Sequence, residues 1–181
     1  MKKILLSLLA VVCLVALVYG SQSLLSKGEN EKVEKDITTA STEEIAEGKS
    51  AQSKQVSGAL PSLDISSNSS QDDILSAMHM MTHQKIIAND KWGAIPMTTE
   101  NIETVHTIIE LSNFSEKKDL LKITTRWKST DFSSVDRDHN SIWSLQGGTI
   151  GKAHGIMTAE EERWFIIHNF GEEVAEIWLN N

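Results

Sequence analysis

Residues suited to a packed core are confined to one part of this chain. All five tryptophans, all four phenylalanines and all six histidines lie between residues 71 and 181. The 111 residues of this segment are long enough for one compact domain with a single core. The sequence therefore predicts one folded domain over residues 71–181.

Apolar residues recur at helical spacing in five stretches of this domain. The clearest helix start is Thr158, with Glu161 three residues later, which is the spacing of a capping box. The tail from Val174 to Leu179 fits a helical turn or an extended segment. The pattern predicts an all-α fold, a small bundle of about five helices. The first helix is expected to end near Asn89, and the starts expected for the first four are Asp72, Thr98, Ser115, and Ser133 or Ser134.

Residues 21–70 have the composition of a linker. They hold twelve serines, no aromatic residue and no histidine, with acidic residues and lysines spread through them. Such a segment buries too little apolar surface to offset the entropy lost on ordering. We expect a disordered tether here.

Residues 1–20 carry the pattern of an export signal. Lys2 and Lys3 precede an apolar run from Ile4 to Tyr19. The positive-inside rule keeps these lysines in the cytoplasm, so the rest of the chain should be exported. We favour a retained single-pass anchor in the cell membrane over residues 4–20; the alternative is cleavage after Gly20 and secretion.

Cysteine content and charge exclude several classes of function. Cys13, within the apolar run, is the only cysteine, so the exported part has no disulfide, thiol nucleophile or cysteine-ligated zinc. Ten basic and seventeen acidic residues give residues 71–181 a formal charge of minus seven. Nucleic acids and anionic lipid surfaces are therefore unsuitable partners.

A histidine pair is the candidate metal site. His79 and His83 are four residues apart on the first expected helix, a spacing that lets two imidazoles reach one ion. Because no glutamate follows His79, the metalloprotease pattern is absent. A third ligand would have to come from another element, such as Asp138 or His139. The alternative is a pair of packed, hydrogen-bonded histidines at the margin of the core.

Two other patterns are incomplete. The calcium-loop spacing that begins at Asp136 has Ser141 in place of glycine and Gly147 in place of the bidentate glutamate. The glycine-rich stretch before Ala153 lacks both the first glycine and the hydroxyl residue of a phosphate-binding loop. No catalytic residue is assigned, and no cofactor is expected.

Two glycine-containing connections could carry a binding surface. Trp92 lies in the first, over residues 91–96, and Lys152 and His154 lie in the second, over residues 147–157. Loops carry function more often than core helices do. The alternative is that Trp92 packs over helix ends and that the glycines only steer the chain. The sequence places Trp127, Trp143 and Trp164 on apolar helix faces, where most of them should be core residues.

Three blocks of this sequence resemble an uncharacterised family of small exported or membrane-anchored proteins from spore-forming Gram-positive bacteria. They are Met81-Thr82-His83-Gln84-Lys85, Lys91-Trp92-Gly93-Ala94-Ile95 and the segment from Asp138 to Lys152. The resemblance covers most of residues 71–170. It implies a bacterial envelope setting and assigns no site residue.

The sequence therefore favours a membrane-tethered extracytoplasmic binding or regulatory module, whose partner is an envelope protein or a wall component. The alternative is a metal-binding protein or metal-dependent enzyme that uses His79 and His83.

Overall fold

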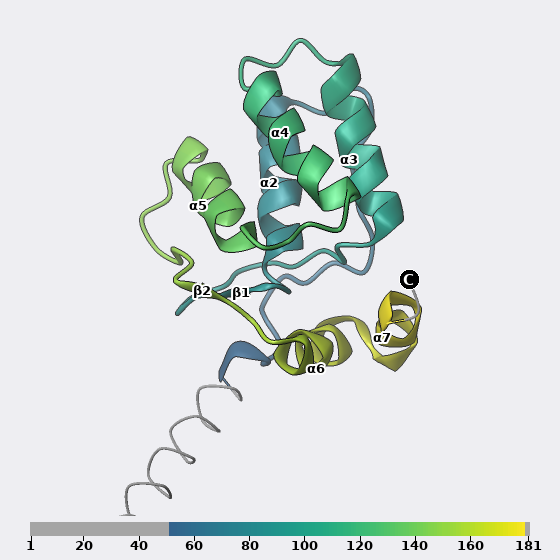
Figure 1. The fold of residues 1–181 in the computed structure, drawn as a ribbon, viewed down its shortest axis with the longest axis vertical. Coiled ribbons are helices and arrows are strands. Elements are labelled where there is room, and N and C mark those ends of the chain that lie inside the picture. Colours follow the sequence, from purple (N-terminus) through teal and green to yellow (C-terminus); the bar gives the residue numbers. More distant parts are fainter. Residues whose placement is uncertain (1–50, 180–181) are drawn as a thin grey trace, which may run out of the picture. The chain divides into compact units, whose positions relative to one another are not determined.

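The computed structural model describes residues 51–179, which are mostly helical (Figure 1). The all-α prediction is therefore confirmed for this part of the chain. One small antiparallel sheet joins the helices. The helices are α2 (Gln71–Thr82), α3 (Thr99–Leu111), α4 (Lys117–Lys128), α5 (Val135–Leu145), α6 (Ala159–Phe170) and α7 (Glu172–Leu179), and the strands are β1 (Ile86–Ile87) and β2 (Gly155–Ile156).

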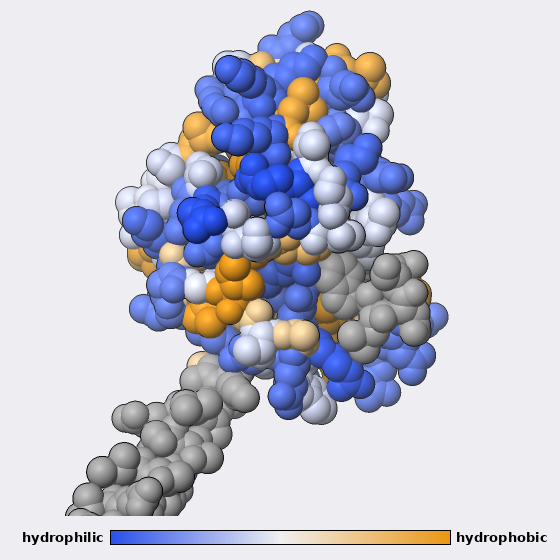
Figure 2. Space-filling view, viewed as in Figure 1, coloured by the Kyte–Doolittle hydropathy of each residue, from blue (hydrophilic) through white to orange (hydrophobic). Residues whose placement is uncertain are grey.

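The main core forms around α2. Its residues Ile74, Met78 and Met81 are fully buried and belong to one apolar cluster with side chains from α3, α4 and α5. In Figure 1, α3 packs beside α4, and α5 packs beside α2. The space-filling view shows a mostly hydrophilic face on which apolar side chains gather in small separate patches (Figure 2).

Two helix starts, those of α3 and α6, have the capping residues expected from the sequence. The hydroxyl of Thr158 accepts a hydrogen bond from the backbone N–H of Glu161, and the Glu161 carboxylate accepts from the backbone N–H of Thr158. This capping box opens α6. Thr98 caps α3 in the same way, by accepting from the backbone N–H of Asn101. The C-terminal tail, for which the sequence allowed a helical turn or an extended segment, is helical and forms α7.

The end of α2 differs from the prediction. The helix ends at Thr82 and not near Asn89. Ile86 and Ile87 instead form β1, where Ile86 pairs with Ile156 of β2. The local spacing of apolar residues cannot predict this pairing, because the two strands are distant in sequence. The early end of α2 turns the chain beneath the helices.

Residues 51–70 lie against the helical domain. The Gln52 side chain exchanges two hydrogen bonds with the backbone of Ala88, at 3.1 and 3.2 Å. The backbone N–H of Leu60 donates to the carbonyl of Ala94 at 2.8 Å, and Leu63 packs against the main core. The predicted linker over residues 21–70 therefore differs from the structure in its last twenty residues; residues 21–50 lie outside the described part.

Within residues 51–179, no helix combines the length and the hydropathy that crossing a bilayer requires. The predicted anchor over residues 4–20 lies outside the described residues.

Candidate metal centre

Three histidines from two helices converge beside the main core. His79 and His83 lie one turn apart on α2, and His139 reaches them from α5. One nitrogen of each imidazole lies within 4.8 Å of the other two. The ring centroids are 4.5 to 5.6 Å apart. The structure therefore brings the predicted histidine pair together with one of the two residues that could complete a metal site.

The hydrogen bonds around His139 determine which nitrogen carries its proton. Asn140 donates from Nδ2 to the carbonyl of Ala153 and accepts at Oδ1 from the N–H of Ala153. That Oδ1 lies 3.1 Å from His139 Nδ1, so Nδ1 is the protonated nitrogen. His139 Nε2 is left with its lone pair, and this buried atom has no hydrogen-bond partner among the described residues.

The same arrangement holds for the other two imidazoles. His83 Nδ1 lies 2.6 Å from the carbonyl oxygen of Gly93, which can only accept. His79 Nδ1 lies 2.5 Å from Oε1 of Gln146, whose Nε2 donates to Ser76. In each case Nδ1 donates to an oxygen, which leaves Nε2 as the potential ligand atom.

Burial keeps these imidazoles neutral. Burial, together with the repulsion of neighbouring charged histidines and of Lys91, lowers the pKa of His83 to about 3 and that of His139 to about 4, although hydrogen bonds to Gly93 and Asn140 oppose the shift. Burial also lowers the pKa of His79, although the hydrogen bond to Gln146 opposes this shift. Because only neutral imidazole has a lone pair to donate, the cluster is in its ligating form at neutral pH.

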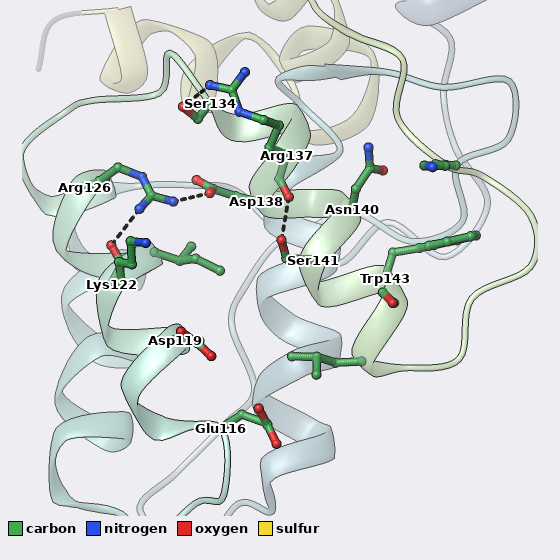
Figure 3. Close-up of a pocket in the computed structure, with 14 residues that line it drawn as sticks. Glu116, Asp119, Lys122, Arg126, Ser134, Arg137, Asp138, Asn140, Ser141 and Trp143 are labelled. Carbon is green, nitrogen blue, oxygen red and sulfur yellow. Dashed lines mark hydrogen bonds and ion pairs between the residues drawn. The ribbon is translucent and has the colours of Figure 1, made fainter.

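Asp138, the other residue considered as a third ligand, faces away from the cluster. Its carboxylate accepts hydrogen bonds from the Arg126 guanidinium and, at 3.0 Å, from Trp127 Nε1. Asp138 and Arg126 line a groove of about 880 Å³ between α4 and α5, and Figure 3 shows the two side chains pointing toward each other. Burial raises the pKa of Asp138, and its hydrogen-bond partners oppose that shift. Asp138 therefore joins α5 to α4, whereas His139 joins α5 to α2.

The cluster opens onto a cavity of about 500 Å³. His79 and His83 form part of its wall, together with Lys91, Trp92 and Ile150. Trp92 is 77% exposed and Ile150 is 72% exposed, so they lie at the rim. The remaining lining residues are Ser76, Met80, Asp90, Gln146 and Gly151.

The two predicted binding connections meet at this cavity. Gly151 approaches the Asp90 carbonyl so closely that a Cβ atom on it would lie 2.7 Å from that oxygen. Trp92, Lys152 and His154 are all exposed. Lys152 lines the groove between α4 and α5, while Trp92 lines the cavity beside the histidines. The structure thus separates Trp92 and Lys152 into different hollows.

The tryptophans expected in the core divide into three kinds. Trp127 is 1% exposed and is a core residue. Trp143 is half-buried, and its Nε1 donates to the Ile150 carbonyl at 2.7 Å. Trp164 is 44% exposed because α6 covers the core with a different face, through Phe165 and Ile166.

The residues that support the histidines were not predicted from the sequence. Gln146 follows His139 by seven residues, a spacing that places both on one face of the helix and its cap. That spacing was the available signal. The contributions of Gly93 and Asn140 depend on tertiary contacts and leave no local pattern.

Comparison with known proteins identifies one domain. No match to the chain is found among curated proteins or solved structures. Residues 78–167 match DUF6241, described as a family of unknown function. All three histidines of the cluster lie within the matched residues. The chain therefore contains a DUF6241 domain, and the candidate metal centre is part of it.

Proposed function

We propose that this domain binds one divalent transition-metal ion, with Zn²⁺ as the first candidate, through Nε2 of His79, His83 and His139. The observation that carries the proposal is that three imidazoles converge and each has its Nδ1 directed to an oxygen acceptor. Histidine ligands in metal sites usually donate their second nitrogen in this way, which fixes the tautomer and the ring orientation. Imidazole ligands suit Zn²⁺, Cu²⁺ and Ni²⁺.

The alternative of packed histidines accounts less well for His139. Its Nε2 is buried and unpaired within the described part of the chain. An unsatisfied buried acceptor costs about 1–3 kcal/mol, and a metal ion at this position would remove that cost. A packed histidine in a structural role would instead be expected to have both nitrogens paired.

Metal binding would require a small contraction of the cluster. Nitrogens that share one tetrahedral Zn²⁺ lie about 3.4 Å apart, given Zn–N bonds of about 2.0–2.1 Å. The imidazole nitrogens here lie within 4.8 Å of one another. The rings would have to rotate about their side-chain bonds to supply the difference.

Calorimetric titration of the purified full chain with Zn²⁺ tests the proposal. We expect one ion per chain and a higher melting temperature with Zn²⁺, because a ligand that binds the folded state stabilises it. His79→Gln and His139→Gln should each weaken binding at least about tenfold, since each removes one ligand. His79→Gln is the safer variant because His79 is only half-buried.

His154→Gln is the matched control. This histidine is exposed and does not belong to the cluster, so its replacement should leave Zn²⁺ affinity unchanged. If folded His79→Gln and His139→Gln proteins bound Zn²⁺ as tightly as the parent chain, the cluster would not be the site.

We further propose that the domain acts outside the cytoplasm as a membrane-tethered module that contacts an envelope protein or a wall component. Lys2 and Lys3 before the apolar run support a location outside the cytoplasm. The exposed Trp92 supports a contact surface for a partner. Protease added to intact, wall-stripped cells should degrade the domain. A domain protected until the cells are lysed would reverse this topology.

A further inference from the structure

We infer that a metal ion bound by His79, His83 and His139 keeps one coordination position open to the cavity beside Trp92, and that a carboxylate with a short apolar tail occupies this position. The inference rests on the proposed metal site. It adds the class of ligand that the site accepts.

The number of protein ligands indicates whether a bound metal ion keeps an open position. The cluster found within residues 51–179 has three members, and Asp138 is held by Arg126 and Trp127. Zinc sites with a structural role are closed by four protein ligands, whereas sites with three protein ligands keep a position for water or another small ligand. Three histidine ligands would therefore leave one coordination position of the metal ion open.

The open position of the metal ion would face the cavity. His139 is fully buried and approaches the cluster from the side of α5. His79 and His83 line the cavity. A fourth ligand can therefore approach from the cavity, which is large enough for a small organic molecule.

Lys91 places a positively charged residue in the wall of this cavity. It lines the same cavity, and its positive charge is near enough to lower the pKa of both His83 and His139. Its Nζ lies 3.9 Å from the Met157 sulfur and 5.0 Å from the Phe165 ring centroid, and neither group is a carboxylate. Burial lowers the pKa of Lys91 to about 7, while the charge of Glu161 opposes the shift.

A ligand carboxylate on the ion would lie in the cavity that Lys91 also lines, and a rotation of the Lys91 side chain away from Met157 and Phe165 would bring its ammonium group to that carboxylate. An anion in that position compensates for the desolvation of the ammonium group and favours its charged form. Asp90 lies at the rim of the same cavity, so the negative group of the ligand is expected at the inner end, beside the histidines.

Part of the cavity wall is apolar and suits an aliphatic tail. Met80, Trp92 and Ile150 line the cavity beside its polar groups. An aliphatic tail that leaves the carboxylate toward the rim would contact these side chains. Burial of each methylene contributes at most about 0.8 kcal/mol.

The test uses the full chain loaded with Co²⁺, whose visible spectrum reports the number and type of its ligands. Acetate and hexanoate are titrated separately into the loaded protein. We expect both to change the Co²⁺ spectrum, and hexanoate to bind about tenfold more tightly because its tail contacts Trp92 and Ile150.

Two variants assign these effects. Lys91→Met keeps an apolar chain of similar length against Phe165 and should weaken both carboxylates about tenfold, while Co²⁺ affinity should not fall, because the substitution removes a positive charge near the histidines. Trp92→Ala should remove most of the advantage of hexanoate over acetate. Lys152→Met is the matched control, because Lys152 lines the other groove.

The outcomes separate the two proposals. If Co²⁺ binds with a tetrahedral spectrum that neither carboxylate changes, the site is closed and this inference is overturned, while the proposed metal binding stands. If carboxylates bind equally well to the parent chain and to Lys91→Met, the role of Lys91 is overturned. If neither Co²⁺ nor Zn²⁺ binds to the folded chain, both proposals fail.

Discussion

His83 and Gly93 lie ten residues apart and are joined by a 2.6 Å contact between the imidazole Nδ1 and the glycine carbonyl oxygen. The contact links the end of α2 to the connection that follows β1. Gly93 has a φ of 77°, which places its backbone in the left-handed region that glycine adopts without strain. The orientation of one candidate metal ligand therefore depends on a glycine in a loop.

Substitution of Gly93 tests this dependence. In Gly93→Ala, the new Cβ would lie 2.5 Å from the sulfur of Met80, so that side chain must move. We expect a loss of about 1–2 kcal/mol from the left-handed backbone alone, a further loss from the displaced Met80, and weaker Zn²⁺ binding. Urea unfolding and Zn²⁺ titration measure these effects.

Gly147→Ala provides the comparison. Gly147 has a φ of 68° and no atom within 4 Å of the position of an added Cβ. It should show the backbone cost without a change in Zn²⁺ affinity. Equal effects of the two substitutions on metal affinity would show that the Gly93 carbonyl does not position His83.

The buried histidines predict acid sensitivity of the metal-free protein. Folding lowers the pKa of His83 from 6.5 to about 3 and that of His139 from 6.5 to about 4. Below pH 6.5 the unfolded chain therefore binds protons that the folded chain does not, and stability falls as the pH falls. At pH 5 each histidine should account for a loss of about 2 kcal/mol relative to neutral pH.

Urea unfolding at pH 7.5 and pH 5 measures this loss. His139→Gln should lose less stability between the two pH values than the parent chain, and His154→Gln should lose as much. An unchanged loss in His139→Gln would assign the acid sensitivity to other groups.

Local sequence signals predicted most of the helix starts. The capping boxes and caps depend on contacts within one turn, and the Thr158 and Thr98 caps are found as expected. The end of α2 was missed because Ile86 and Ile87 continue an apolar pattern whose strand partner lies at Gly155 and Ile156. A period does not distinguish a continuing helix from a short strand that pairs with a distant segment.

The candidate site was predictable in part for a similar reason. The spacing of His79 and His83 depends only on the helix period, and it was recognised. The choice between Asp138 and His139 depends on how α5 is rotated against α2. Adjacent helical residues point about 100° apart, so Arg126 and Trp127 hold one of them while the other faces α2.

The tryptophans provide a contrast in stability. Trp127 is 1% exposed and Trp92 is 77% exposed. We expect Trp127→Ala to cost about 3–5 kcal/mol through a core cavity, and Trp92→Ala to change stability by no more than about 0.5 kcal/mol. Thermal melting of the two variants measures the difference. A Trp92→Ala protein that melts as early as Trp127→Ala would place the loop tryptophan in the core.

The segment before α2 should contribute to stability. A chain that begins at residue 71 lacks the hydrogen bonds of Gln52 with Ala88 and of Leu60 with Ala94. We expect it to melt about 3 °C or more below a chain that begins at residue 49, which corresponds to a loss of about 1 kcal/mol or more. Equal melting temperatures would support a domain boundary at residue 71.

The hydrogen bond from the Gly93 N–H to the Ser57 carbonyl has a mechanical consequence. Tension applied to the chain on the N-terminal side of residue 51 would reach the domain through the segment that contains Gln52 and Ser57. Ahead of Ser57, that segment is held by hydrogen bonds of Ser53 with Glu161 and His168 of α6, and Gly93, which orients His83, lies further along the path. A pull on this protein would therefore load α6 before the loop that orients His83, and it would reach that loop once those hydrogen bonds had broken.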